Sequence, residues 1–189
     1  MSDPTNGGLR PFQQNASPRN AFRVLVLCTG NSARSQIGEA LLAARGAARR
    51  PRPVEAASAG SRPAPQVNPY AVETLRAHGI AWEGRTPKRI DDVAAESFDL
   101  VVTVCDNARD ACPVFPGAAA QVHWGLPDPA DETEPDAARR AFAATYDALA
   151  ARVGALLALP LEQLDPATLR DRAQAIHANP PQARAASGP

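Results

Sequence analysis

Several features that would link the 189-residue chain to other classes of protein are absent or scarce. Its 20 basic and 20 acidic residues give a formal net charge of zero, so charge indicates no nucleic-acid or membrane partner. Three cysteines are too few for the disulfide framework of a small secreted domain. No apolar run reaches transmembrane length without a charge, because Asp147 and Arg152 interrupt the stretch 141–159. We therefore expect a cytoplasmic protein.

The length suits one domain with a full-sized core, and the composition divides the chain into three parts. Residues 1–20 are polar, with several prolines and glycines and no apolar core, which predicts a flexible N-terminal arm rather than a signal peptide. Residues 21–160 are expected to form an α/β domain. Residues 161–189 are expected to form a C-terminal helix and a disordered tail.

Strand and helix patterns alternate through the central part. Short apolar runs at 22–27, 54–58, 98–104 and 121–124 predict four strands. Helical patterns are expected at 35–48, between Asn68 as the N-terminal cap and Gly79, from Pro135 onward, and at 164–177. Strands that alternate with helices predict an α/β fold with a four-stranded parallel sheet flanked by helices.

The stretch 22–36 is the most informative one, because a cysteine stands where a predicted strand ends. Cys28 follows the buried run, five residues separate it from Arg34, and a helical pattern starts near Ser35. Such a cysteine lies at the carboxyl edge of the sheet, where open α/β sheets bind ligands. The alternative is an inert, buried core cysteine.

The loop after Cys28 has the composition of an anion-binding cradle. Backbone N–H groups ahead of a helix N-terminus bind anions, and the guanidinium of Arg34 fits two oxygens of a tetrahedral oxyanion. Ser35 is placed to donate a hydrogen bond to the sulfur. These dipoles and this charge predict a nucleophilic thiolate, with the pKa of Cys28 lowered from about 8.5 into the range ~3.5–7.5. The cradle residues are Thr29, Gly30, Asn31, Ser32, Ala33 and Arg34.

Two further cysteines follow the third predicted strand. Cys105 occupies the same position on its strand as Cys28 does on the first, and Cys112 comes seven residues later. This spacing is too wide for a thioredoxin-like C-x-x-C motif. A disulfide between them requires the helical segment from Cys105 to Cys112 to loop out. The alternatives are two unrelated buried cysteines or a zinc site with His123, which lacks a fourth ligand.

The motif C-T-G-N-S-A-R-S-Q resembles the low-molecular-weight tyrosine phosphatase superfamily, and most closely its arsenate reductases. The similarity spans residues 23–159 and includes V-V-T-V-C, then C-P, and H-W-G-L-P-D-P-A, all in order. It implies a low-molecular-weight phosphatase-like catalytic domain at 21–160 that reduces arsenate, a phosphate-like oxyanion, to arsenite. It also implies that Cys28 is the nucleophile, Cys105 the resolving thiol and Cys112 the thiol exposed to an external reductant. The expected reductant is thioredoxin, with glutathione and glutaredoxin as the alternative; no bound cofactor is expected.

An aspartate in H-W-G-L-P-D-P-A completes the predicted chemistry. Asp128 lies between prolines after the fourth strand, where a carboxylic acid could protonate the departing oxygen of the anion. Asp131 is the alternative acid, and a turn residue is the alternative role for Asp128. In related phosphatases an aromatic residue follows D-P, whereas here Ala130 does. This difference removes a wall suited to an aryl phosphate and favours a small inorganic anion.

The resemblance also marks a candidate cation site. Potassium-binding relatives use positions like Asn31, Glu39 and Ser58, with an aspartate at the position of Lys88, the single lysine of this chain. Either the Lys88 ammonium takes the place of the ion beside Glu39, or Lys88 is a solvated side chain. No other metal site is expected.

Three functions compete on the sequence alone. The first is arsenate reduction, since a pair of thiols can deliver two electrons to arsenic(V), while thiols do not reduce phosphate. The second is a small protein-tyrosine phosphatase with incidental extra thiols. The third is a non-enzymatic thiol redox sensor or arsenic-binding protein, which would need the cysteines but not Arg34 or Asp128.

Overall fold

The structure is a computed structural model, and it describes residues 20–111 and 114–179. The predicted N-terminal arm, apart from its last residue, lies outside the described residues. Cys112 and the last ten residues of the predicted C-terminal tail also lie outside them.

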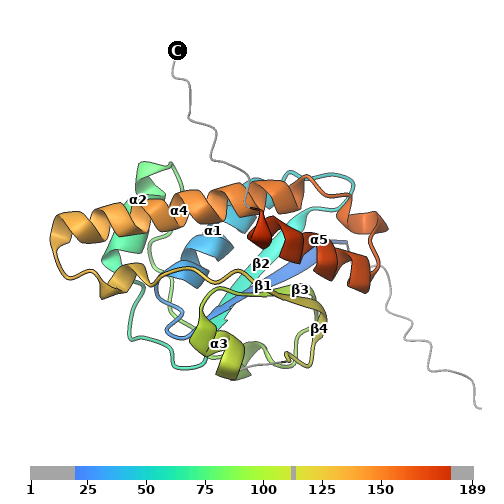
Figure 1. Cartoon of the computed structure of the whole chain (residues 1–189), viewed down its shortest axis with the longest axis horizontal. Coiled ribbons are helices and arrows are strands. Elements are labelled where there is room, and N and C mark those ends of the chain that lie inside the picture. Colours follow the sequence, from blue (N-terminus) through green and yellow to red (C-terminus); the bar gives the residue numbers. More distant parts are fainter. Residues whose placement is uncertain (1–19, 112–113, 180–189) are drawn as a thin grey trace, which may run out of the picture.

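A single four-stranded sheet forms the centre of the protein (Figure 1). Its strands are β1 (Phe22–Cys28), β2 (Val54–Gly60), β3 (Phe98–Thr103) and β4 (Ala118–His123). They lie in the order β2-β1-β3-β4, and every neighbouring pair is parallel. The predicted four-stranded parallel sheet is therefore confirmed. Strand β4 begins three residues before the expected start, because alanines carry little strand signal in a sequence but pair readily with β3.

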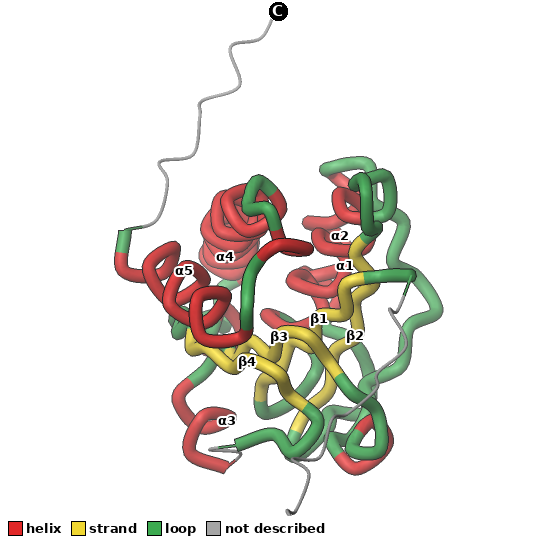
Figure 2. The backbone as a smooth tube through the Cα atoms, turned by 90° about the vertical axis from the view of Figure 1, so that its right-hand side faces the viewer, coloured by secondary structure: helices red, strands yellow, loops and turns green. Residues whose placement is uncertain are grey.

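The longer helices lie together on one side of the sheet, as Figures 1 and 2 show. The opposite side carries a short α-helix, a single 3-10 turn and loops. The first group is α1 (Arg34–Gly46), α2 (Pro69–Ala77), α4 (Pro135–Leu157) and α5 (Pro166–Ala178), and the second is α3 (Asp106–Ala111) and η1 (Asp91–Val93). Two more 3-10 turns, η2 (Pro129–Asp131) and η3 (Leu161–Gln163), flank α4. Among the described residues, no helix is both long and apolar enough to cross a membrane.

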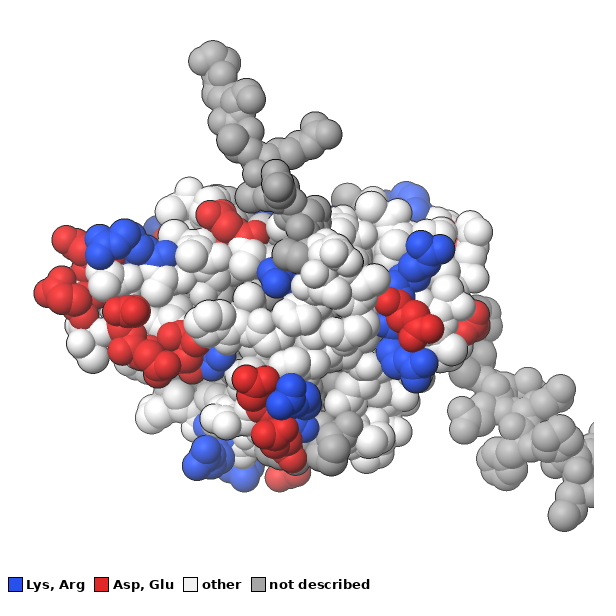
Figure 3. Space-filling model, viewed as in Figure 1, with Lys and Arg blue, Asp and Glu red and all other residues white. Residues whose placement is uncertain are grey.

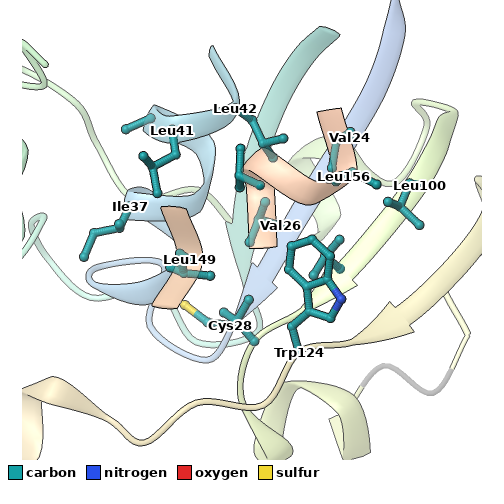
Figure 4. Packing of buried hydrophobic residues seen from close by; sticks show 14 of the residues in the cluster. Val24, Val26, Cys28, Ile37, Leu41, Leu42, Leu100, Trp124, Leu149 and Leu156 are labelled. Carbon is teal, nitrogen blue, oxygen red and sulfur yellow. The ribbon is translucent and has the colours of Figure 1, made fainter. Parts of the chain in front are cut away.

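Alternation along β1 divides the core between the two faces of the sheet. Val24, Val26 and Cys28 pack into the large cluster beneath the helices, whereas Leu25 and Leu27 join a smaller cluster on the opposite face. Figure 4 shows Cys28 at one end of the large cluster, to which Trp124 also belongs. The strand is therefore buried on both faces, as expected for a parallel sheet, and it holds the cysteine rigidly.

Helix α5, whose role the sequence left open, packs on the domain itself. Leu169 and Ala173 are buried in the large cluster, and the Trp124 indole N–H donates to the carbonyl of Ala173 at 2.9 Å. The helix therefore covers β4 and fixes the point where that strand ends.

The strand order places the carboxyl ends of β1 and β3 side by side at a switch point of the sheet. From β1 the chain crosses to β2 on one side, and later returns to β3 on the other. At such a switch point the carboxyl ends of neighbouring strands leave an opening that binds ligands. The Val104 N–H donates to the Leu27 carbonyl at 2.9 Å, so the residues that follow β3 stay aligned with the end of β1. This alignment brings Cys28 and Cys105 to the same edge.

Candidate active site

Cys28 is the last residue of β1, and its sulfur is surrounded by hydrogen-bonding groups. The thiol is buried; its Sγ lies 2.9 Å from Ser35 Oγ and accepts the Asn31 N–H at 3.1 Å. Asn31 adopts the left-handed conformation, with φ of 46°, as its side chain tolerates. The loop therefore folds back over the sulfur, and the sequence-predicted Cys28, Asn31 and Ser35 come together.

The segment that follows β2, residues 61–68, forms hydrogen bonds to the carbonyl groups of this loop. The Arg62 N–H donates to the Thr29 carbonyl at 2.9 Å, and the Ala64 N–H donates to the Gly30 carbonyl at 2.8 Å. Similar bonds reach the carbonyls of Cys28 and Ser32. Because the carbonyls are already occupied by this segment, the shape of the loop does not depend on a ligand.

Gly60, at the end of β2, permits this close approach. A Cβ atom at this position would lie 2.5 Å from the Thr29 carbonyl oxygen and 2.9 Å from the Asn31 nitrogen. At Gly30 the nearest neighbour of an added Cβ would be 3.8 Å away. The loop thus depends on a glycine outside it, a residue that the sequence analysis did not single out.

We expect Gly60→Ala to weaken the binding of phosphate, measured as its inhibition constant, by about tenfold or more. The added Cβ displaces the loop backbone, and a displacement of about 1 Å at a site strongly reduces its function. The inhibition constant for phosphate and the circular-dichroism melting curve would both be measured. Gly30→Ala serves as the control and should have a much smaller effect. Equal inhibition constants for wild type and Gly60→Ala would contradict the close-packing argument.

Arg34 connects the loop to the segment after β4. Its Nη1 donates to the Leu126 carbonyl at 2.8 Å, and its Nη2 contacts the Asp128 carboxylate. The guanidinium is buried, and its Nε has no protein partner among the described residues. A buried N–H without a partner is costly, so Arg34 retains a donor suited to an anion.

Asp128 reaches Arg34, whereas Asp131, the alternative acid, does not. Asp128 is half-buried and caps η2, because its Oδ1 accepts the Ala130 N–H at 3.1 Å. Asp131 lies inside η2 and is exposed. Of the two candidates, the structure therefore brings Asp128 to the loop.

We expect Arg34→Lys to weaken phosphate or sulfate inhibition roughly 10- to 100-fold, because a point charge cannot replace a two-pronged guanidinium. Inhibition constants measured in parallel for Arg34→Lys and for Arg139→Lys, an exposed arginine on α4, would separate this effect from a general change in charge. An unchanged constant for Arg34→Lys would remove Arg34 from anion binding.

Cys105 lies against the same loop. It is buried, 4% exposed, and its Sγ is 3.4 Å from the Thr29 hydroxyl oxygen. Because β1 and β3 are neighbouring parallel strands, Cys28 and Cys105 lie at the same edge of the sheet. Cys112 lies outside the described residues. Both ring nitrogens of His123 have protein partners, Thr103 Oγ1 at 2.8 Å and Asp106 Oδ1 at 3.0 Å, which gives no support to the zinc alternative.

The pKa of Cys28 departs from the sequence-based prediction. Burial raises the pKa of the Cys28 thiol above its usual value, the hydrogen bonds from Ser35 and Asn31 oppose this rise, and the nearby Cys105 adds to it. The prediction of a lowered pKa was wrong in direction because it counted the loop's dipoles but not the removal of the thiol from water.

The candidate cation site holds a lysine side chain. The Lys88 ammonium lies 3.6 Å from Glu39 Oε2, and its backbone N–H donates to Asn31 Oδ1 at 2.7 Å. Ser58 connects Glu39 with Asn31, because its hydroxyl donates to the Glu39 carboxylate at 2.5 Å and accepts from the Asn31 side-chain amide at 2.7 Å. The observed contact favours the alternative in which the ammonium stands beside the buried Glu39.

Gln36 and Trp82 belong to the site but were missed by sequence reasoning. The Gln36 amide donates to the Asn31 carbonyl at 3.0 Å and to Asn31 Oδ1 at 3.2 Å, and it accepts the Trp82 indole N–H at 2.8 Å. The position of Gln36, directly after the R-S of the loop, was the available signal. No local sequence signal pointed to Trp82, because it lies 46 residues away from Gln36 in the sequence.

A buried cysteine at the end of a central parallel strand, under a loop that leads directly into a helix N-terminus at the switch point of the sheet, defines the class: an α/β protein with a thiol at the ligand-binding edge of its sheet. The chain belongs to the low molecular weight phosphotyrosine protein phosphatase family, whose model matches residues 23–169.

The relatives within this family include arsenate reductases. The chain is 36% identical over 134 residues to the arsenate reductase of Brevibacillus brevis, covering 71% of this chain and 92% of the relative. It resembles an arsenate reductase solved in its phosphate binding state, with a TM-score of 0.62 and 25% identity over 72% of this chain and 97% of the other. It also resembles a thioredoxin-dependent arsenate reductase of Corynebacterium glutamicum, with a TM-score of 0.50 and 30% identity over 69% of this chain and 60% of that one.

Proposed function

We propose that this protein is an arsenate reductase, which converts arsenate to arsenite with electrons from its own thiols. The observation that carries the proposal is the second buried thiol, Cys105, placed against the anion-binding loop that holds Cys28. Hydrolysis of a phosphate ester needs one thiol, an arginine and an acid, and gives Cys105 no task. The similarity to arsenate reductases supports the same conclusion.

The first step uses the loop to hold arsenate above Cys28. The phosphate-bound relative supports oxyanion binding at this place, with the loop N–H groups and Arg34 as donors. The Cys28 thiolate forms a bond to arsenic, one As–O bond breaks, and Asp128 protonates the departing oxygen, which leaves as water. Since burial raises the pKa of Cys28, the donors around the sulfur are needed to favour the thiolate.

The second step moves the electrons. The Cys105 thiolate attacks the Cys28 sulfur, and the electron pair of the S–As bond passes to arsenic, which falls from oxidation state V to III. Two thiols become one disulfide, which supplies the two electrons, and arsenite leaves. In the proposed relay Cys112 then attacks Cys105 and frees Cys28, leaving a Cys105–Cys112 disulfide for an external dithiol.

Thioredoxin is the proposed reductant, supported by the thioredoxin-dependent relative; glutathione with glutaredoxin is the alternative. The deciding experiment is steady-state arsenate reduction with each system supplied separately, following NADPH oxidation and arsenite formation. Turnover with thioredoxin and thioredoxin reductase, but not with glutathione and glutaredoxin, is the expected result. Absence of arsenite with both systems would reject the reductase function.

We expect Asp128→Asn to slow arsenate turnover about 10²–10⁴-fold, the usual contribution of a general acid, while phosphate inhibition changes little. The values of kcat and the inhibition constant would be measured across pH. Asp131→Asn is the matched control, because Asp131 is exposed within the same turn. If Asp131→Asn has the large effect and Asp128→Asn does not, the acid has been misassigned.

A further inference from the structure

His123, the last residue of β4, makes contacts that the proposed reaction does not use. Its Nδ1 is 2.8 Å from Thr103 Oγ1 on the neighbouring strand, and its Nε2 is 3.0 Å from Asp106 Oδ1. Asp106 is the first residue of α3 and follows Cys105 directly. The imidazole therefore bridges the sheet and the helix that begins beside the second thiol.

The chemistry of the partners determines the direction of these hydrogen bonds. An ionised carboxylate only accepts, so His123 Nε2 carries a proton and donates to Asp106. Gly125 leaves space for the ring, because a Cβ at that position would lie 2.6 Å from His123 Nε2. The chain thus has a glycine where any other residue would push the imidazole away from Asp106.

Helix α5 holds the backbone of His123 from the other side. The His123 N–H donates to Gln174 Oε1 at 3.2 Å, and the Gln174 amide donates back to the His123 carbonyl at 3.3 Å. The ring of His123 is therefore attached to a rigid part of the fold, while Asp106 belongs to a short helix.

Helix α3 has few other attachments among the described residues. Ala108 is its one buried side chain with a described environment, and Asp106, Asn107, Arg109 and Asp110 are exposed. Arg109 pairs with Asp106 and Asp110 inside the helix itself, where Figure 3 shows acidic and basic side chains side by side. The N–H groups of Ala108 and Arg109 both donate to the Cys105 carbonyl at 3.2 Å. Displacement of the first turn of α3 would therefore displace Cys105.

We propose that His123 is a positioning residue that fastens the first turn of α3 through Asp106 and thereby keeps Cys105 buried against the loop. The functional use that we assign to this contact rests on the proposed function. In that reaction, the segment 106–111 has to leave its helical form when Cys105 forms a disulfide with Cys112. The His123–Asp106 hydrogen bond is then one of the contacts that must break, together with the packing of Ala108, and its strength contributes to how often Cys105 becomes accessible.

The test measures alkylation of Cys105 by iodoacetamide, read by mass spectrometry, in a Cys28→Ser, Cys112→Ser background. Alkylation of a buried thiol reports the population of the open form when closing is fast. Because Asp106 is exposed, we expect a moderate acceleration of about fivefold in His123→Ala. Asp106→Ala should give the same increase, and the double variant should give no more than either single variant.

Two further variants separate positioning from general loosening. His123→Gln keeps an N–H donor near the position of Nε2 and should restore a rate close to that of the parent protein. Asp110→Ala removes an exposed carboxylate of the same helix that does not contact His123, and it should change nothing. Alkylation of Cys28, measured in a Cys105→Ser, Cys112→Ser background, should be unaffected by His123→Ala.

Additive effects of His123→Ala and Asp106→Ala, or an unchanged Cys105 rate in His123→Ala, would overturn the proposal. An equal acceleration at Cys28 would overturn it as well, since that would show a general loosening of the fold. None of these measurements uses arsenate, so a failure here is distinct from a failure of the proposed reductase function.

Discussion

Cys28→Ser is expected to abolish arsenate reduction and the hydrolysis of a small aryl phosphate together. In the proposed mechanism both reactions begin with attack by the same sulfur. Among the described residues, the hydrogen-bonding partners of that sulfur are Ser35 and Asn31, and neither is a general base that could activate a serine hydroxyl. The serine is close in size to the cysteine and can keep the contacts to Ser35 and Asn31. The loss should therefore reach the detection limit while the fold stays intact.

The measurements are arsenite formation with each reductant, hydrolysis of p-nitrophenyl phosphate, and phosphate binding by calorimetry. Phosphate binding is the internal control, because the loop N–H groups and Arg34 remain in the variant. Retention of either activity at the wild-type rate would show that Cys28 is not the nucleophile.

Cys105→Ser is expected to stop arsenite release and to spare slow hydrolysis of the aryl phosphate. Reduction needs a second electron-donating thiol, and Cys105 is the one that the structure places against the loop. In the proposed mechanism, hydrolysis needs only Cys28, Arg34 and Asp128. The serine keeps a hydroxyl within reach of Thr29, so a loss of reduction would reflect the missing thiol rather than a cavity.

Mass spectrometry after one turnover with arsenate gives the sharpest check of the roles proposed for the three cysteines. The wild type should contain a Cys105–Cys112 disulfide, and Cys112→Ser should stall with a Cys28–Cys105 disulfide. In the oxidised wild type, amide exchange across 106–111 should be faster than in the reduced protein. A wild type that stays reduced, without turnover, in the presence of arsenate would favour a phosphatase.

Local patterns in the sequence were sufficient for the frame of the fold and for the site loop. The apolar run that ends at Cys28, the five-residue spacing to Arg34 and the helical pattern after Ser35 are all short-range signals. A strand, a turn and a helix N-terminus are each specified by neighbouring residues. For the same reason, alternation of strands with helices was enough to predict a parallel sheet of four strands.

Tertiary structure alone decided which distant residues meet at this loop. Only the strand order β2-β1-β3-β4 places Cys105 beside Thr29, and only the fold selects Asp128 over Asp131 as the partner of Arg34. The same holds for the approach of Gly60 to the loop, 30 residues along the chain from Gly30. The pKa of Cys28 depends on burial by the whole domain, a property that no local pattern contains, because desolvation is the sum of every group that packs around the sulfur.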